Sequence, residues 1–138
     1  MFEFTTNIRV RYAETDQMGY VYYGNYAMYY EVARVEALRS LGLRYKTLEE
    51  TGIMMPVLEI KSKFLRPARY DDQLSIKLTI REMPTKRMIF HYEIFNEADK
   101  LINVGETTLA FVEMANGKPC HAPESITNVL NGFFDGTD

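Results

Sequence analysis

Apolar and polar residues alternate along several segments of the chain, and this two-residue period predicts β-strands. In the clearest case, the apolar positions from Leu74 to Ile80 are separated by Ser75, Lys77 and Thr79. The same alternation runs through residues 58–64, and side chains that alternate in this way point to opposite faces of a sheet. We therefore expect half-buried strands at 58–64 and 74–80. Further strands are predicted at 5–12, 87–96 and 101–114, with turns at 83–86 and 96–99.

One long segment has an apolar pattern of a different kind. Between Asn25 and Leu41 only six residues are polar, and the apolar ones surround most of the circumference of a helix. A helix that is apolar nearly all round has to be covered on nearly all sides. Asn25 is expected to cap its start by accepting a backbone N–H bond, and Gly42 follows its end. A short amphipathic helix is predicted near the C-terminus, where one apolar stripe is formed by Ile126, Val129, Leu130 and Phe133.

The order of these elements is a strand, a long helix, four antiparallel strands and a short helix. Strands grouped after a single helix are typical of α+β proteins rather than of alternating α/β proteins. A five-stranded antiparallel sheet curled around the long helix satisfies every pattern above, whereas a ferredoxin-like sandwich would need a second long helix among the strands. No repeat or linker interrupts the pattern, so residues 1–138 are predicted to form a single domain.

Composition and charge narrow the possible functions. The hydrophobic content of 46% is enough for a core, and the net charge of −3 with no run of Lys and Arg does not favour a nucleic-acid partner. The apolar stretches are too short for an integral membrane protein, and the first four residues lack the features of a signal peptide. The single cysteine, Cys120, excludes an intrachain disulfide and fits a reducing cytoplasm.

Few of the residue types that carry chemistry are available. Two histidines, His91 and His121, and one cysteine do not make a convincing zinc site, so no metal is expected. The chain has no Gly-rich phosphate loop and no strained serine elbow. Cys120 and His121 are adjacent, and neighbours in sequence rarely face each other as a nucleophile and its base. No metal or redox cofactor is implied.

The loop before the long helix offers a different kind of site. Asp16 lies a few residues before the helix start, where the first N–H groups lack internal partners and the end of the helix carries partial positive charge. Such donors can polarise a carbonyl oxygen and stabilise an oxyanion. A carboxylate held beside them by a turn at Gly19 would complete a minimal acyl-transfer site. The simpler alternative is that Asp16 only bonds its own backbone within a turn.

The same loop carries a run of spaced residues, Asp16-x-x-Gly19-x-Val21-x-Tyr23-x-Asn25-Tyr26. Arg11-Tyr12 precede it, Glu31 and Arg34 follow it, and further downstream stand Phe64-x-Arg66-Pro67-Ala68 and Tyr70-Asp71-Asp72. Together these segments resemble the 4-hydroxybenzoyl-CoA thioesterase family, over residues 8 to about 114. The resemblance implies the hot-dog fold, in which an antiparallel sheet wraps a long helix, and acyl-CoA thioesterase activity.

Residue by residue, the resemblance assigns roles to the motif. Asp16 matches the catalytic aspartate, the Tyr23 backbone N–H matches the donor to the thioester carbonyl, and Gly24 opens the helix beneath it. Many relatives have His where this chain has Tyr23. The candidate substrate-binding residues are Asn25, Tyr26, Arg66 and Arg69, with the two arginines placed for the phosphates of coenzyme A. Glu31 is expected to pair with Arg34, one turn away, rather than to serve as a second catalytic carboxylate.

These residues predict hydrolysis of an acyl-CoA thioester to a free acid and coenzyme A. Tyrosines crowd the proposed pocket, which favours short-chain or aromatic acyl groups. The Asp16 carboxylate can attack the thioester directly or activate a water molecule, and both mechanisms are consistent with the sequence. The alternatives are a non-catalytic acyl-CoA-binding module, a thioesterase for acyl-carrier-protein thioesters, and a dehydratase, which would need a histidine in the site. The resemblance also implies a homodimer or homotetramer with its active site between subunits.

Overall fold

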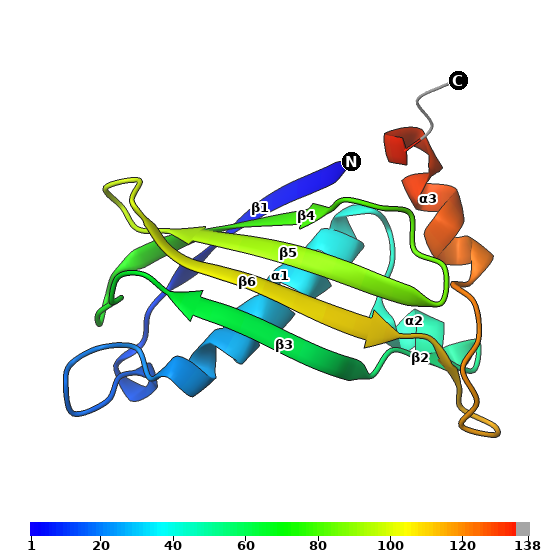
Figure 1. Cartoon of the computed structure of the whole chain (residues 1–138), viewed down its shortest axis with the longest axis horizontal. Coiled ribbons are helices and arrows are strands. Elements are labelled where there is room, and N and C mark those ends of the chain that lie inside the picture. The colour runs from blue at the N-terminus through cyan, green and yellow to red at the C-terminus, as the bar shows by residue number, and fades with distance from the viewer. Residues whose placement is uncertain (135–138) are drawn as a thin grey trace.

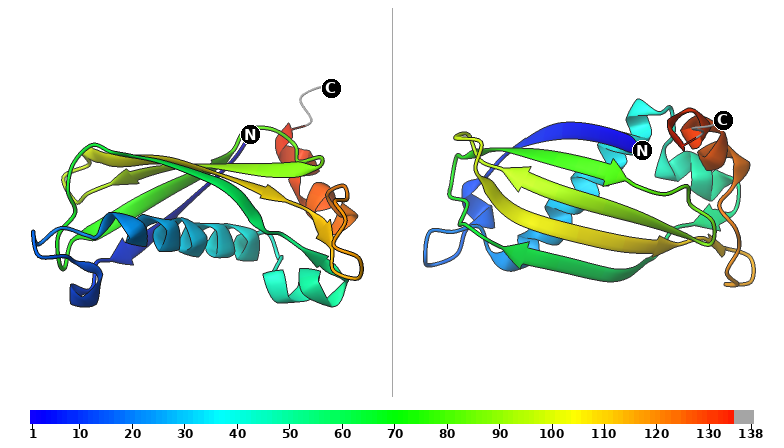
Figure 2. Two further views of the ribbon diagram at one scale, coloured as in Figure 1. Left: turned by 60° about the horizontal axis from the view of Figure 1, so that its bottom comes forward. Right: turned by 45° about the horizontal axis from the view of Figure 1, so that its top comes forward.

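The computed structural model describes residues 1–134, and residues 135–138 of the predicted domain lie outside this part. One antiparallel sheet has the strand order β1-β4-β5-β6-β3. Its strands are β1 (Phe2–Arg9), β3 (Val57–Phe64), β4 (Gln73–Ile80), β5 (Arg87–Phe95) and β6 (Leu101–Ala110). The long helix α1 (Tyr26–Ser40) lies across one face of this sheet (Figures 1 and 2). The α+β architecture predicted from the hydrophobic pattern is therefore confirmed.

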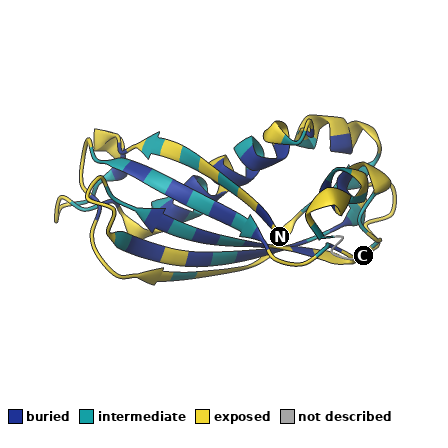
Figure 3. Ribbon diagram, turned by 90° about the horizontal axis from the view of Figure 1, so that it is seen from above, coloured by how far each residue is buried: buried dark blue, intermediate teal, exposed yellow. Residues whose placement is uncertain are grey.

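The central strands follow the alternation of the sequence closely. In β4, every second side chain from Leu74 to Ile80 is fully buried, and the intervening residues are half-buried. The same alternation in β5 buries Met88, Phe90, Tyr92 and Ile94, so buried and partly exposed bands alternate along both strands (Figure 3). These side chains pack against the apolar face of α1 and form the core.

Residues 1–134 bury one face of α1, which differs from the expected cover on nearly all sides. Val32, on the opposite face, is 37% exposed. The expected pairing of Glu31 with Arg34 is also wrong, because Glu31 lies on the solvent side and Arg34 on the side that faces the sheet. There the Arg34 guanidinium donates a hydrogen bond of 3.1 Å to the hydroxyl of Tyr92.

The first strand lies three residues earlier than predicted, because residues 10–12 leave the sheet and a turn of 3₁₀ helix follows at Tyr12–Glu14. The predicted strand 101–114 is divided, because β6 ends at Ala110 and β7 (Val112–Glu113) pairs separately with β2 (Ile53–Met54). Neither β2 nor the short helix α2 (Tyr45–Glu50) was predicted. The C-terminal helix α3 (Glu124–Phe134) was predicted. It buries Ile126 and Leu130 and sets the Phe133 ring edge-on against Phe2, with centroids 5.1 Å apart.

The edge strand β3 is exposed on both faces, although its alternation predicts half-burial. Within residues 1–134 it pairs in the sheet with β6 alone, and α1 makes its closest backbone approaches to β1 and β4, on the other side of the sheet. Val57, Leu58, Ile60 and Phe64 are therefore 41 to 51% exposed.

None of the helices in residues 1–134 combines the length and the apolar character that crossing a bilayer requires.

Candidate active site

The loop between β1 and α1 closes on itself as two short antiparallel arms. The Asp16 amide donates to the Tyr20 carbonyl at 2.8 Å, and the Tyr22 amide donates to the Glu14 carbonyl at 2.9 Å. The turn between the arms depends on Gly19, whose φ of +81° is a conformation that glycine adopts without strain. The Val21 amide bonds the Ala68 carbonyl at 2.8 Å and so fastens the second arm to the rest of the chain.

Asp16 lies on the first arm and uses one carboxylate oxygen in the turn. Its Oδ1 accepts hydrogen bonds from the amides of Met18 at 2.9 Å and Tyr20 at 3.3 Å. Within residues 1–134, Oδ2 accepts no hydrogen bond. A carboxylate has two oxygens with about four acceptor positions. Oδ1 can therefore stabilise the turn while Oδ2 remains available to react.

Tyr23 and Gly24 lie where the second arm enters the helix. A turn of 3₁₀ helix, Tyr23–Asn25, runs directly into α1, so the helical N-terminus begins at Tyr23. The amides of Tyr23 and Gly24 are the first in this turn, and neither donates to an acceptor within the described part of the chain. A Cβ at Gly24 would stand 2.7 Å from the Tyr22 ring, so a side chain at this position would force the ring to move.

A pocket of about 270 Å³ brings several predicted residues together. Asp16, Tyr23, Tyr26 and Arg66 all line it, and Phe64 of β3 forms part of its apolar wall. The Phe64 ring is 5.2 Å from the Tyr26 ring and 6.4 Å from the Tyr23 ring, centroid to centroid. Burial raises the pKa of Tyr26 to about 12, so its phenol is neutral at physiological pH.

Two predicted substrate-binding residues do not line this pocket. The Asn25 side chain neither caps the helix nor faces the pocket, because its Nδ2 donates to the Glu14 carbonyl at 2.8 Å. The Arg69 guanidinium lies over the ring of Tyr20, 5.2 Å from the centroid, and stacks on the pocket wall.

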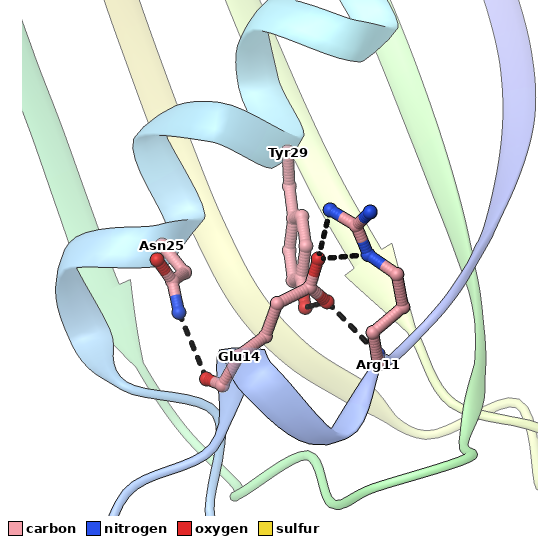
Figure 4. Close-up of polar contacts among 4 residues, drawn as sticks. All are labelled: Arg11, Glu14, Asn25 and Tyr29. Carbon is pink, nitrogen blue, oxygen red and sulfur yellow. Dashed lines mark hydrogen bonds and ion pairs between the residues drawn. The ribbon is translucent and has the colours of Figure 1, made fainter.

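Glu14 was not singled out from the sequence, yet it is the most extensively bonded side chain of the loop (Figure 4). It is 5% exposed. Its Oε1 accepts from the Arg11 amide at 3.0 Å and from the Tyr29 hydroxyl at 2.8 Å, and its Oε2 accepts from Arg11 Nε at 2.8 Å. Arg11 Nη2 is also 2.8 Å from Oε2. The side chain of Glu14 is thus held on all sides.

These contacts decide the ionisation of Glu14. Burial by itself raises the pKa of its carboxyl group, because the charged form loses water. The hydrogen bonds from Arg11 and Tyr29, with the positive charge of Arg11, more than offset burial and lower the pKa below its ordinary value. Burial and the neighbouring Glu14 carboxylate raise the pKa of Tyr29, which remains a hydroxyl donor.

Comparison with known proteins agrees with this geometry. Residues 10–130 match the family model described as the thioesterase-like superfamily. The chain belongs to this superfamily. The putative acyl-CoA thioesterase YneP of Bacillus subtilis is 33% identical over 112 residues, which cover 81% of each chain. The acyl-CoA thioester hydrolase YbgC of Escherichia coli O157:H7 is 33% identical over 119 residues, which are 86% of this chain and 89% of the relative.

A solved structure confirms the hot-dog fold that the motif implied. The DHNA-CoA thioesterase from Staphylococcus aureus superposes with a TM-score of 0.84 and 34% sequence identity, over 97% of this chain and 85% of its own. The matched range, residues 10–130, includes the loop that carries Asp16, the helix α1 and strands β3 to β6. The resemblance to hot-dog acyl-CoA thioesterases is confirmed.

The histidines of this thioesterase-like protein lie outside the pocket beside Asp16. His91 is on β5, where its Nδ1 is 3.6 Å from a Glu106 carboxylate oxygen. Burial and the charge of Arg81 lower the pKa of His91 more than Glu106 and Glu82 raise it. Among residues 1–134, no group of three or more His, Cys, Asp or Glu side chains is placed to hold a metal ion. A histidine-dependent dehydratase therefore has no support from this pocket.

Proposed function

We propose that this protein is an acyl-CoA thioesterase that uses Asp16 as its reactive carboxylate. One observation carries the proposal: within residues 1–134, Oδ2 of Asp16 accepts no hydrogen bond and the amides of Tyr23 and Gly24 donate none, and Asp16 and Tyr23 line the same pocket. The names of YbgC and YneP, which refer to acyl-CoA thioesters, support the substrate class.

In the proposed reaction, the thioester carbonyl oxygen accepts a hydrogen bond from the Tyr23 amide at the helical N-terminus. The donor and the positive end of α1 stabilise the negative charge that develops on this oxygen. The Asp16 carboxylate either attacks the carbonyl carbon, to give an anhydride that water hydrolyses, or takes a proton from the attacking water. Both courses release coenzyme A and the free acid.

The acyl group that we propose is short or aromatic. The pocket of about 270 Å³ is lined by the side chains of Tyr20, Tyr23, Tyr26 and Phe64, which leave little length for a long alkyl chain. Arg66 lies on the same pocket, and Arg69 is held nearby on the Tyr20 ring. We assign these two guanidinium groups to the phosphates of coenzyme A, which arginine binds through paired donors.

The proposal includes a homodimer or homotetramer in the cytoplasm. The free edge of β3 carries exposed apolar side chains at Leu58, Ile60 and Phe64, and an unpaired edge of this kind favours pairing with another chain. Phe64 also lines the pocket, so a subunit that pairs with β3 would lie beside the site. The active site would then be completed between two subunits.

Thiol release from a panel of thioesters tests the proposal. The panel contains butyryl-CoA, 4-hydroxybenzoyl-CoA, palmitoyl-CoA and the butyryl thioester of an acyl-carrier protein. We expect faster turnover of the first two than of palmitoyl-CoA. Preference for the carrier-protein thioester would change the substrate class. Tight binding of acyl-CoA without thiol release from any member would instead identify a binding module.

A further inference from the structure

Glu14 bonds both arms of the candidate loop at once. Its main-chain carbonyl accepts from the Tyr22 amide at 2.9 Å and from Asn25 Nδ2 at 2.8 Å. Its carboxylate accepts from Arg11 and from Tyr29, which lies one turn inside α1 (Figure 4). One residue thus connects the first arm, the second arm and the helix to one another.

The atoms proposed for catalysis lie next to these contacts in the chain. Asp16 follows Glu14 by two residues on the first arm, and Tyr23 directly follows Tyr22, whose amide is bonded to Glu14. A shift of either arm would therefore change the distance between the carboxylate of Asp16 and the amide of Tyr23. Reacting groups that are misplaced by about 1 Å can cost on the order of 10²-fold in rate.

We infer that Glu14 is a positioning residue, which fixes the Asp16 carboxylate and the Tyr23 amide relative to each other through Tyr29 and Arg11. The inference rests on the proposed function, since it assigns Glu14 a role in that same site. Glu14 is not itself a catalytic residue. Its two oxygens are already occupied, and it does not line the pocket on which Asp16 and Tyr23 lie.

The variant Tyr29→Phe tests the inference, with Tyr92→Phe as its matched control. Each removes one buried phenol hydroxyl, but Tyr29 bonds Glu14, whereas Tyr92 bonds Thr107 and Arg34 in the core. For hydrolysis of 4-hydroxybenzoyl-CoA, we expect Tyr29→Phe to lower kcat by about 10- to 100-fold and to change KM by less than about threefold. Tyr92→Phe should keep kcat within about twofold of wild type even where it lowers stability.

The rate of hydrogen exchange at the Tyr22 amide is a second measurement, and it does not depend on enzymatic activity. This amide is protected by the Glu14 carbonyl, so Tyr29→Phe and Glu14→Gln should each speed its exchange by at least about tenfold, while Tyr92→Phe leaves it unchanged. Equal kcat in Tyr29→Phe and wild type, or equal Tyr22 exchange, overturns the inference. If the wild-type protein hydrolyses none of the thioesters, the proposed function fails, and the exchange rates still decide whether Glu14 holds the two arms.

Discussion

The ring of Tyr30 lies directly beneath Gly105, so close that a side chain cannot occupy position 105 without moving the ring. A Cβ built there would overlap the Tyr30 hydroxyl and stand 2.8 Å from its Cε2. The ring is also stacked on Tyr92, with centroids 4.2 Å apart and an interplanar angle of 16°. Its hydroxyl bonds Ser62 and Asn103, so Tyr30 is held from three sides. This contact lets α1 approach β6.

We predict that Gly105→Ala lowers the free energy of unfolding by about 1–3 kcal/mol, because the added methyl group overpacks this contact. Urea denaturation measures the change. Gly132→Ala is the control: it lies in α3, and apart from its chain neighbours and the backbone of α3 no atom of residues 1–134 lies within 4 Å of its Cβ position. That variant should keep or raise stability, by up to about 1 kcal/mol. Equal effects of the two variants would contradict the proposed overlap with Tyr30.

We predict that Asp16→Asn abolishes thioester hydrolysis and leaves the fold intact. The amide oxygen of Asn can still accept the hydrogen bond from the Met18 amide, so the turn is retained. An amide is neither a nucleophile for the thioester nor a base for water. Thiol release measures activity, and circular dichroism checks the fold. Activity close to wild type in a folded variant would refute the assignment of Asp16.

The backbone and the side chain of Tyr23 are expected to contribute differently. Tyr23→Phe keeps the amide and the ring, and we expect turnover within about threefold of wild type. Tyr23→Pro removes the amide donor, and we expect a loss on the order of 10²–10³ in kcat. Proline suits this position, because Tyr22 before it is extended, with ψ of 132°, and Tyr23 is the first residue of its helical turn.

Tyr23→Ala is the control for the lost ring in the proline variant. It retains the amide, so it should lose much less activity than Tyr23→Pro. Steady-state kinetics on one acyl-CoA compares all three variants. A loss in Tyr23→Phe as large as that in Tyr23→Pro would show that the hydroxyl is catalytic and that the oxyanion donor lies elsewhere.

Stability should depend on pH through Glu14. The pKa of its carboxyl group is lowered in the folded state from an ordinary value of 4.5, so the folded state favours the charged form. This stabilisation is fully present above about pH 4.5 and is lost as pH falls through the lowered pKa. We expect the difference in unfolding free energy between wild type and Glu14→Gln to shrink below pH 4.5. Urea denaturation from pH 7 to pH 3 gives this difference, and a constant difference would contradict the prediction.

The β3 edge should determine the oligomeric state. Ile60→Glu places a charge on the exposed apolar edge, so we expect it to convert a dimer into monomers at micromolar concentration. Light scattering measures the mass. Ile89→Glu is the control, because Ile89 is similarly exposed but lies on β5, which has a strand on both sides. A wild-type protein that is monomeric and fully active would rule out the proposed assembly.

Parts of the fold were predictable because a single local signal determined them. The strict alternation in β4 and the long apolar run of α1 gave their element types and approximate bounds. The helix α2 has six residues, too few for a helical period to show. The burial of β3 was predicted wrongly because alternation reports which residues share a face, whereas burial depends on what lies against that face.

Some residues of the candidate site could be predicted from the sequence, and others could not. Asp16, Tyr23 and Tyr26 were predicted from residues spaced along one short segment, and all three line one pocket. Asn25 was expected at that pocket, but its amide turns back to the Glu14 carbonyl. The role of Glu14 depends on Tyr29, which approaches only when α1 packs beside the loop, and no sequence spacing reports that approach.

The strand order also determines when the site is completed as the chain folds. Strands β4, β5 and β6 are neighbours in both sequence and space, whereas β1 pairs with β4 across more than sixty residues, from Arg9 opposite Gln73 to Phe2 opposite Ile80. Short loops cost less entropy to close than long ones, so we expect the β4–β5–β6 meander to form first. The loop that carries Asp16 leaves the ribosome early, yet it gains its supporting strands only after residues 73–110 have been made. A nascent chain would therefore carry the candidate motif long before the pocket around it is formed.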